Sequence, residues 1–178
     1  MKLFSIFTLT AAFAVTLSAA DISQAIDVKR WVISECTAKT EGNTLVVNMP
    51  IDYKNGQYQK YLIGWPRLYL YKMQGMEKDW SKAKAVSFDL KLEFTGKTAK
   101  FPITFHVFTK TPGAKKDVSV AATIPALKNN TVNKVVMPLD KVKDPAFVTG
   151  FGFSISESRY KHGENLKFTV SNFKLINK

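Results

Sequence analysis

The chain has 178 residues, of which 46% are hydrophobic, and its formal net charge is +12. It holds one cysteine, Cys36, which excludes an internal disulfide, so a folded domain has to be stabilised by its hydrophobic core. The positive charge favours acidic partners such as anionic polysaccharides, whereas the scattered lysines and the lack of an arginine-rich run argue against nucleic-acid binding.

The first twenty residues have the pattern of a secretory signal peptide. Lys2 precedes the largely apolar run from Leu3 to Leu17, and Ser18-Ala19-Ala20 places small residues ahead of a cut before Asp21. The apolar run is too short for a spanning helix, so we expect no stable membrane insertion. Residues 1–20 are predicted to be removed, leaving residues 21–178 as one domain in the periplasm or outside the cell. Loss of Lys2 lowers the net charge by one, from +12 to +11.

The first part of the predicted domain contains turn signals between short extended segments. Val28 to Ser34 is predicted to be a strand, with Cys36 as a buried thiol near its end. The turn Glu41-Gly42-Asn43 predicts a hairpin in which Thr44 to Asn48 is the partner of that strand. Asn55-Gly56 predicts a further turn, with residues 58–63 extended after it.

The segment from Gly64 to Phe94 shows the strongest strand pattern in the chain. Leu68 and Leu70 alternate with Arg67, Tyr69 and Tyr71, which predicts one buried face and one solvent-facing side. A second strand shows the same alternation, with Val86, Phe88, Leu90 and Leu92 facing inward between Ser87, Asp89, Lys91 and Glu93. Trp65 and Trp80 are predicted to be packing anchors because each indole buries a large area.

The remaining residues continue as short strands between turns. Further strands are predicted at residues 101–108, 118–124, 132–137, 150–156 and 166–175, with a bulge at Ser171-Asn172 where the apolar phase slips. The total is nine or ten strands, without a convincing amphipathic helix. This pattern predicts an all-β sandwich or barrel.

Several short motifs resemble the galactose-binding-like jelly rolls, which often occur as carbohydrate-binding modules attached to bacterial glycoside hydrolases. The matching segments are Trp65-Pro66, Asp79-Trp80-Ser81, Val86-Ser87-Phe88-Asp89-Leu90, Val135-Val136-Met137-Pro138-Leu139, Gly150-Phe151-Gly152-Phe153 and Val170-Ser171-Asn172-Phe173-Lys174-Leu175. The resemblance implies a jelly-roll β-sandwich of two antiparallel sheets and carbohydrate as the partner. Such domains often carry a structural calcium ion bound partly by an acidic residue of the closing strand. Ser171 stands at that place, which weakens the case for calcium, and no other metal or cofactor is predicted.

The candidate ligand-binding residues are solvent-facing aromatic and charged side chains. Tyrosine rings can stack on sugar rings, and arginine can pair with a carboxylate or sulfate. We therefore predict contacts from Arg67, Tyr69 and Tyr71, with Asp89, Lys91 and His106 on the same solvent-facing side. A second candidate is the loop that contains Arg159, Tyr160 and His162. The alternative is that all of these are ordinary outer-face residues of a sandwich.

Catalysis has little support in the sequence. The two histidines lie far apart, and no nucleophile-elbow, zinc-protease or paired-cysteine motif occurs, so no catalytic residue is predicted. The leading prediction is an exported, non-catalytic carbohydrate-binding domain, with acidic glycans favoured by the charge. An envelope protein without a sugar site and a small β-sandwich glycoside hydrolase or polysaccharide lyase stay open, and the sequence does not indicate an oligomeric state.

Overall fold

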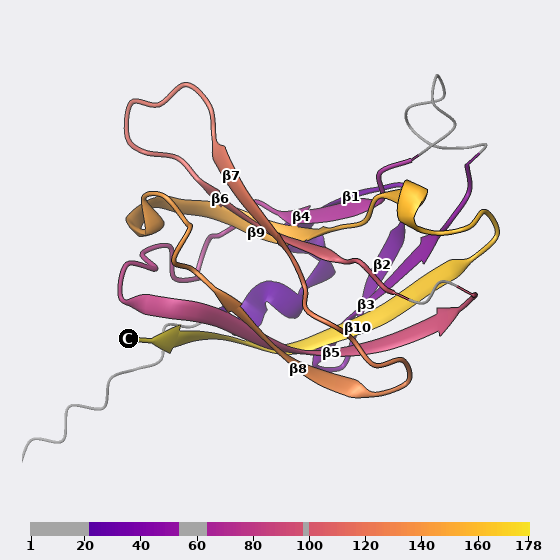
Figure 1. Cartoon of the computed structure of the whole chain (residues 1–178). Coiled ribbons are helices and arrows are strands. Elements are labelled where there is room, and N and C mark those ends of the chain that lie inside the picture. The colour runs from indigo at the N-terminus through magenta and orange to yellow at the C-terminus, as the bar shows by residue number, and fades with distance from the viewer. Residues whose placement is uncertain (1–21, 54–63, 98–99) are drawn as a thin grey trace, which may run out of the picture.

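The protein folds as a two-layer β-sandwich (Figure 1). The computed structural model describes residues 22–53, 64–97 and 100–178. The predicted signal peptide, the Asn55-Gly56 turn and the extended segment 58–63 lie outside these residues. Within the described part of the chain there is no α-helix, and no helix is long and apolar enough to span a membrane. The all-β prediction is therefore confirmed.

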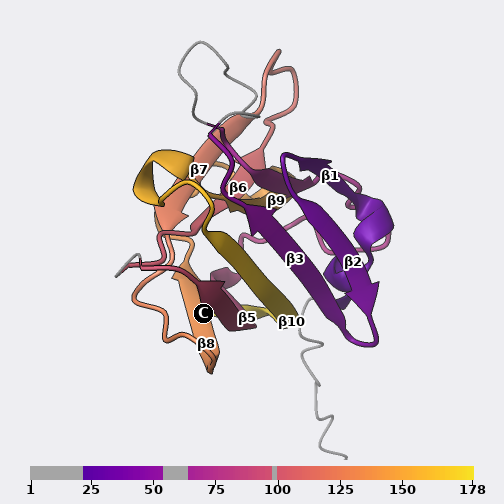
Figure 2. The same ribbon diagram turned by 90° about the vertical axis from the view of Figure 1, so that its right-hand side faces the viewer.

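Each layer is an antiparallel sheet of five strands, and the two layers form a jelly-roll sandwich (Figures 1 and 2). The first sheet has the order β1 (Trp31–Ser34), β4 (Arg67–Leu70), β9 (Val148–Ser154), β6 (Thr104–Thr109) and β7 (Val118–Thr123). The second sheet has the order β2 (Thr37–Glu41), β3 (Thr44–Pro50), β10 (Asn165–Asn177), β5 (Ala83–Thr95) and β8 (Val132–Pro138). Among the described residues there are four short 3-10 helices. Two of them, η1 (Ser23–Ile26) and η2 (Val28–Arg30), precede β1, whereas η4 (Pro145–Phe147) leads into β9 and η5 (Glu157–Arg159) lies between β9 and β10.

The core lies between the two sheets and is rich in phenylalanine. Phe88 of β5 meets Phe153 of β9 with ring centroids 5.4 Å apart, so the alternating apolar residues of both sheets interdigitate. Trp80, in the loop before β5, is fully buried and its ring centroid lies 5.7 Å from that of Phe151. The prediction of Trp80 as a packing anchor is confirmed.

Two details of the second sheet test the predicted strands. β10 changes register against β5 between Ser171 and Lys174, and Asn172 has a φ of 55°, so the predicted bulge is confirmed. The predicted hairpin partner was wrong: β3 pairs with β2, whereas Trp31–Ser34 belongs to the first sheet. Glu35, with a φ of 57°, separates β1 from β2, and Cys36 follows in this turn, where it is only partly buried.

Candidate ligand-binding face

The outer face of the first sheet carries the predicted tyrosines and the arginine. Leu68 and Leu70 of β4 are both 0% exposed because they point into the core. Alternation along the strand therefore turns Arg67, Tyr69 and then Tyr71 to the other side. The structure thus brings these three predicted residues together.

Two glycines of the neighbouring strand β9 make room for the tyrosine rings. A Cβ atom on Gly152 would collide with the carbonyl oxygen of Leu68 and would lie 2.7 Å from Cδ1 of Tyr69. A Cβ atom on Gly150 would lie 3.0 Å from Cδ1 of Tyr71. Because glycine has no side chain, the rings lie close against β9 and reach across it toward β6.

The rings of Tyr69, Tyr71, His106 and Phe108 form a continuous aromatic strip on this face. The ring centroid of Tyr69 lies 5.2 Å from that of His106 and 5.0 Å from that of Phe108. Tyr71 lies 5.2 Å from Phe108 and 6.1 Å from Tyr69. Tyr71 is 42% exposed, whereas His106 and Phe108 are buried, so the tyrosines form the solvent-accessible part of the strip.

Protonation states in the strip follow from burial. Desolvation lowers the pKa of His106 to about 4, so its ring is neutral at pH 7, and its Nε2 lies 2.8 Å from Oγ of Ser154. Desolvation, followed by the nearby carboxylate of Asp117, raises the pKa of Tyr71. Its hydroxyl therefore stays protonated and can donate a hydrogen bond. His106, predicted as a ligand contact, is instead buried and packs against the ring of Tyr69.

Trp65 extends the exposed aromatic surface, contrary to its prediction as a packing anchor. Its side chain is 39% exposed, and the guanidinium carbon of Arg67 lies 5.3 Å from its ring centroid. Its backbone N–H donates to Oε2 of Glu35 at 2.8 Å, which fixes the chain just before β4. Trp65 lies just outside β4, so the alternation within that strand did not specify its direction.

The structure separates Asp89 and Lys91 from this face. Both residues lie on β5, in the second sheet. Their side chains therefore face outward on the opposite side of the sandwich from Arg67. Oδ2 of Asp89 accepts from Asn172 at 2.7 Å, and Lys91 pairs with Glu93 at 2.9 Å. Lys167 and Lys91 together lower the pKa of Glu93 to about 2. Their predicted role as secondary contacts beside Arg67 was therefore wrong, because each sheet has its own solvent-facing side.

The predicted loop candidate divides into two exposed residues, Arg159 and His162, and one buried residue, Tyr160. Tyr160 is 3% exposed, its ring centroid lies 5.9 Å from that of Phe94, and burial raises its pKa. It therefore belongs to the core rather than to a site. Arg159 is exposed at the end of η5, whereas His162 lies apart beside Asp52, with Nδ1 and Oδ1 3.7 Å apart.

Arg159 lines a polar hollow at one end of the first sheet. The hollow has a volume of about 480 Å³. Its lining comes from Lys100, Pro102, Thr104, Thr123, Ser156 and Arg159. Thr104 belongs to β6 and Thr123 to β7, so this hollow adjoins the outer face that carries the aromatic strip.

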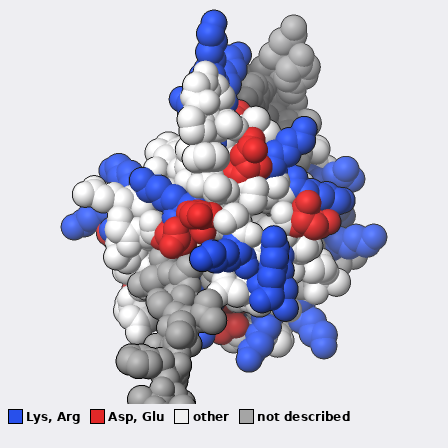
Figure 3. Space-filling model, turned by 90° about the vertical axis from the view of Figure 1, so that its left-hand side faces the viewer, with Lys and Arg blue, Asp and Glu red and all other residues white. Residues whose placement is uncertain are grey.

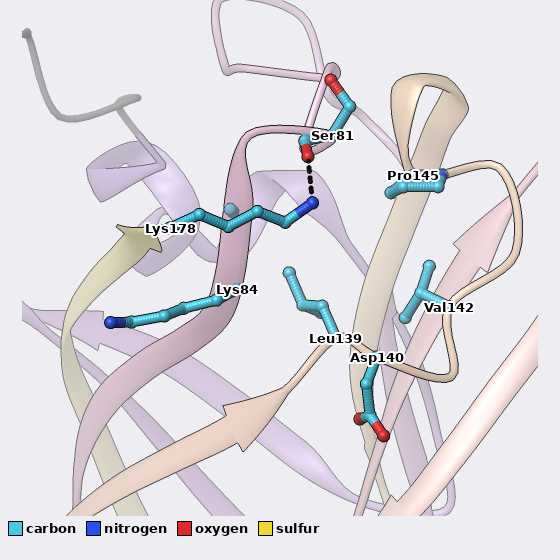
Figure 4. Close-up of a pocket in the computed structure, with 8 residues that line it drawn as sticks. Ser81, Lys84, Leu139, Asp140, Val142, Pro145 and Lys178 are labelled. Carbon is cyan, nitrogen blue, oxygen red and sulfur yellow. Dashed lines mark hydrogen bonds between the residues drawn. The ribbon is translucent and has the colours of Figure 1, made fainter.

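A smaller hollow of about 270 Å³ lies between the start of β5 and the segment after β8 (Figure 4). Nζ of Lys178 donates to the backbone oxygen of Ser81 at 3.0 Å, so this ammonium group already has an internal acceptor. Around this end of the sandwich, lysine and arginine side chains are interleaved with carboxylates (Figure 3). Among the described residues, no group of three or more histidines, cysteines, aspartates or glutamates is arranged to hold a metal ion.

Comparisons with known proteins identify the fold. No protein-family model matches the chain, and no curated protein matches its sequence. A family 11 carbohydrate-binding module from Clostridium thermocellum, solved with a β-1,3-1,4-mixed-linked tetrasaccharide, aligns with a TM-score of 0.53 and 18% identity over 83% of this chain and 89% of that chain. A family 30 carbohydrate-binding module aligns with a TM-score of 0.53 and 17% identity over 82% and 77% of the two chains. The chain therefore has the β-sandwich fold of carbohydrate-binding modules, as its sequence motifs predicted.

Proposed function

We propose that this protein is a carbohydrate-binding module whose ligand lies along the outer face of β4, β9 and β6. The aromatic strip is the observation that supports this function. Tyr69 and Tyr71 form an aromatic surface outside the core, with Arg67 and Trp65 beside them. Aromatic rings bind the apolar faces of sugars, while neighbouring polar groups bind hydroxyls. The shared fold with modules described as carbohydrate-binding points to the same class of ligand.

Tyr71 is the best single residue for testing the site. Tyr71 is 42% exposed and packs against Phe108 on the outer face, so its removal leaves the core intact. We expect Tyr71→Ala to weaken glycan binding by about 1–2 kcal/mol, which is roughly 5- to 30-fold in affinity. Val136→Ala is the control because Val136 is 51% exposed on β8 of the other sheet. Equal glycan affinity of Tyr71→Ala and wild type would place the site elsewhere.

A glycan array at two salt concentrations distinguishes this function from its rivals. Selective binding that persists at high salt indicates a built site, whereas uniform binding to every anion that fades with salt indicates charge alone. A protein that binds no glycan on the array fits a structural role in the envelope. Release of reducing ends or unsaturated products from a bound polysaccharide indicates a hydrolase or lyase instead.

Export is the second part of the proposal. The pattern of residues 1–20 supports cleavage before Asp21 and release into the periplasm or the exterior. Mass spectrometry of the exported protein is expected to show a chain that begins at Asp21. An exported form that still contains residues 1–20 would contradict this expectation.

A further inference from the structure

The outer face of the first sheet changes in character from aromatic to polar along its strands. Tyr69 of β4 and His106 of β6 both pair with Gly152 of β9, so these three residues form one row across the sheet, and this row is aromatic. The next row on the same face lies two residues further along each strand. It consists of neighbouring residues on β4, β9, β6 and β7, namely Arg67, Ser154, Thr104 and Thr123. We refer to these four residues as the polar row. The row starts at Arg67 and ends in the polar hollow, to which it contributes Thr104 and Thr123.

The polar hollow combines two cations with three hydroxyl groups. Lys100 and Arg159 supply the positive charges, and Thr104, Thr123 and Ser156 supply the hydroxyls. Its volume of about 480 Å³ falls within the range of small-molecule sites. Arginine binds carboxylate and sulfate in a planar fork geometry, and hydroxyls can donate to the remaining oxygens.

The carboxylates that lie near the hollow in sequence have other partners. Glu157, which is 2% exposed, accepts from the backbone N–H of Gly64 at 2.6 Å and from that of Asp52 at 3.2 Å. Glu164 accepts from the backbone N–H of Lys97 at 2.7 Å and from that of Lys161 at 2.8 Å. Within the described part of the chain, neither Lys100 nor Arg159 forms an ion pair. The charge of the hollow is therefore available to an external anion.

We propose that the polar hollow binds the carboxylate or sulfate group of an acidic polysaccharide that lies along the aromatic strip. This inference rests on the proposed function and specifies its ligand class. Thr104 lies two strands from Arg67, which is roughly 10 Å at the usual strand spacing. One ligand can therefore contact Arg67 and the hollow at once while its sugar rings pack on Tyr69 and Tyr71.

The test uses glycan pairs that differ only in charge. Oligogalacturonate is compared with its carboxyl-reduced form, and dextran sulfate with dextran, by isothermal titration at low and moderate salt. The wild-type protein is expected to bind the acidic member of at least one pair more tightly. Arg159→Gln is expected to weaken that binding roughly tenfold or more, because a hydrogen bond to a charged group is lost, and to leave binding of the neutral member unchanged. Equal affinity of the wild type for both members of each pair would overturn the proposal.

Lys84→Gln is the matched control because it removes one positive charge at the hollow beside Lys178 (Figure 4). An equal loss of acidic-glycan affinity in Lys84→Gln and Arg159→Gln would show that net charge alone acts, which overturns the proposal. Lys100→Gln serves as a second variant with the same expected loss, should Arg159→Gln lower the melting temperature. A single-stranded DNA oligonucleotide that binds as tightly as the acidic glycan, with the same loss in Arg159→Gln, would overturn the polysaccharide assignment.

The outcomes also separate this inference from the proposed function. If Arg159→Gln binds acidic glycans like wild type while Tyr71→Ala does not, the aromatic site stands and the polar hollow is not part of it. If Tyr71→Ala binds every probe like wild type, the proposed function fails whatever the hollow does.

Discussion

Replacement of Trp80 by alanine provides a quantitative test of how this sandwich is stabilised. Trp80 is 0% exposed, packs against Phe151, and donates from Nε1 to the backbone oxygen of Glu77 at 2.9 Å. Trp80→Ala removes the buried ring and leaves a cavity, which typically costs about 3–5 kcal/mol of unfolding free energy. For a domain of this size, that loss lowers the melting temperature by roughly 6–20 °C.

Trp65→Ala is the matched control, because Trp65 is 39% exposed. Its unfolding free energy is expected to stay within about 0.5 kcal/mol of wild type, as for most surface substitutions. Both variants are measured by scanning calorimetry and urea unfolding. The reasoning is refuted if Trp80→Ala loses less than about 1 kcal/mol or if both variants lose equally.

Three further predictions concern the first sheet and its surroundings. Gly152→Ala places a methyl group 2.7 Å from Cδ1 of Tyr69, so overpacking is expected to cost about 1–3 kcal/mol in urea unfolding; an unchanged midpoint would contradict this. The folded-state pKa of His106 is about 4, below the unfolded value of 6.5, so the unfolded chain binds a proton first as pH falls. The contribution of neutral His106 to stability is complete above pH 6.5 and is lost as pH falls toward 4. His106→Asn is therefore expected to reduce the fall in melting temperature between pH 7 and pH 5. Burial raises the pKa of Cys36 to about 11, so thiol labelling at pH 8 is expected to be much slower in native protein than in urea; equal rates would count against this.

Alternation along single strands was predictable because it depends only on neighbouring residues. Leu68 and Leu70 point inward and Tyr69 and Tyr71 outward, as the period of two requires. The same pattern did not indicate which sheet a strand joins. Asp89 shows the alternation of a solvent-facing residue, yet it lies on the opposite side of the sandwich from Arg67.

Residues beside turns were harder to predict than residues within strands. Trp65 precedes β4 and stays exposed, although a tryptophan of that size is usually well buried. Tyr160, in a loop of charged residues, is turned into the core beside Phe94. Neither position belongs to a regular strand, so no period in the sequence specified its direction.

The all-β class, the inward and outward faces of the main strands, and the bulge at Ser171-Asn172 could be predicted from the sequence, because each follows from a pattern within a few residues. The packing of Tyr69 against Gly152, and the single row formed by Arg67, Ser154, Thr104 and Thr123, became visible in the folded structure alone. These neighbours come from strands far apart in the chain. Their proximity depends on the pairing order of the sheet, which arises from the packing of the whole core and leaves no local period to detect.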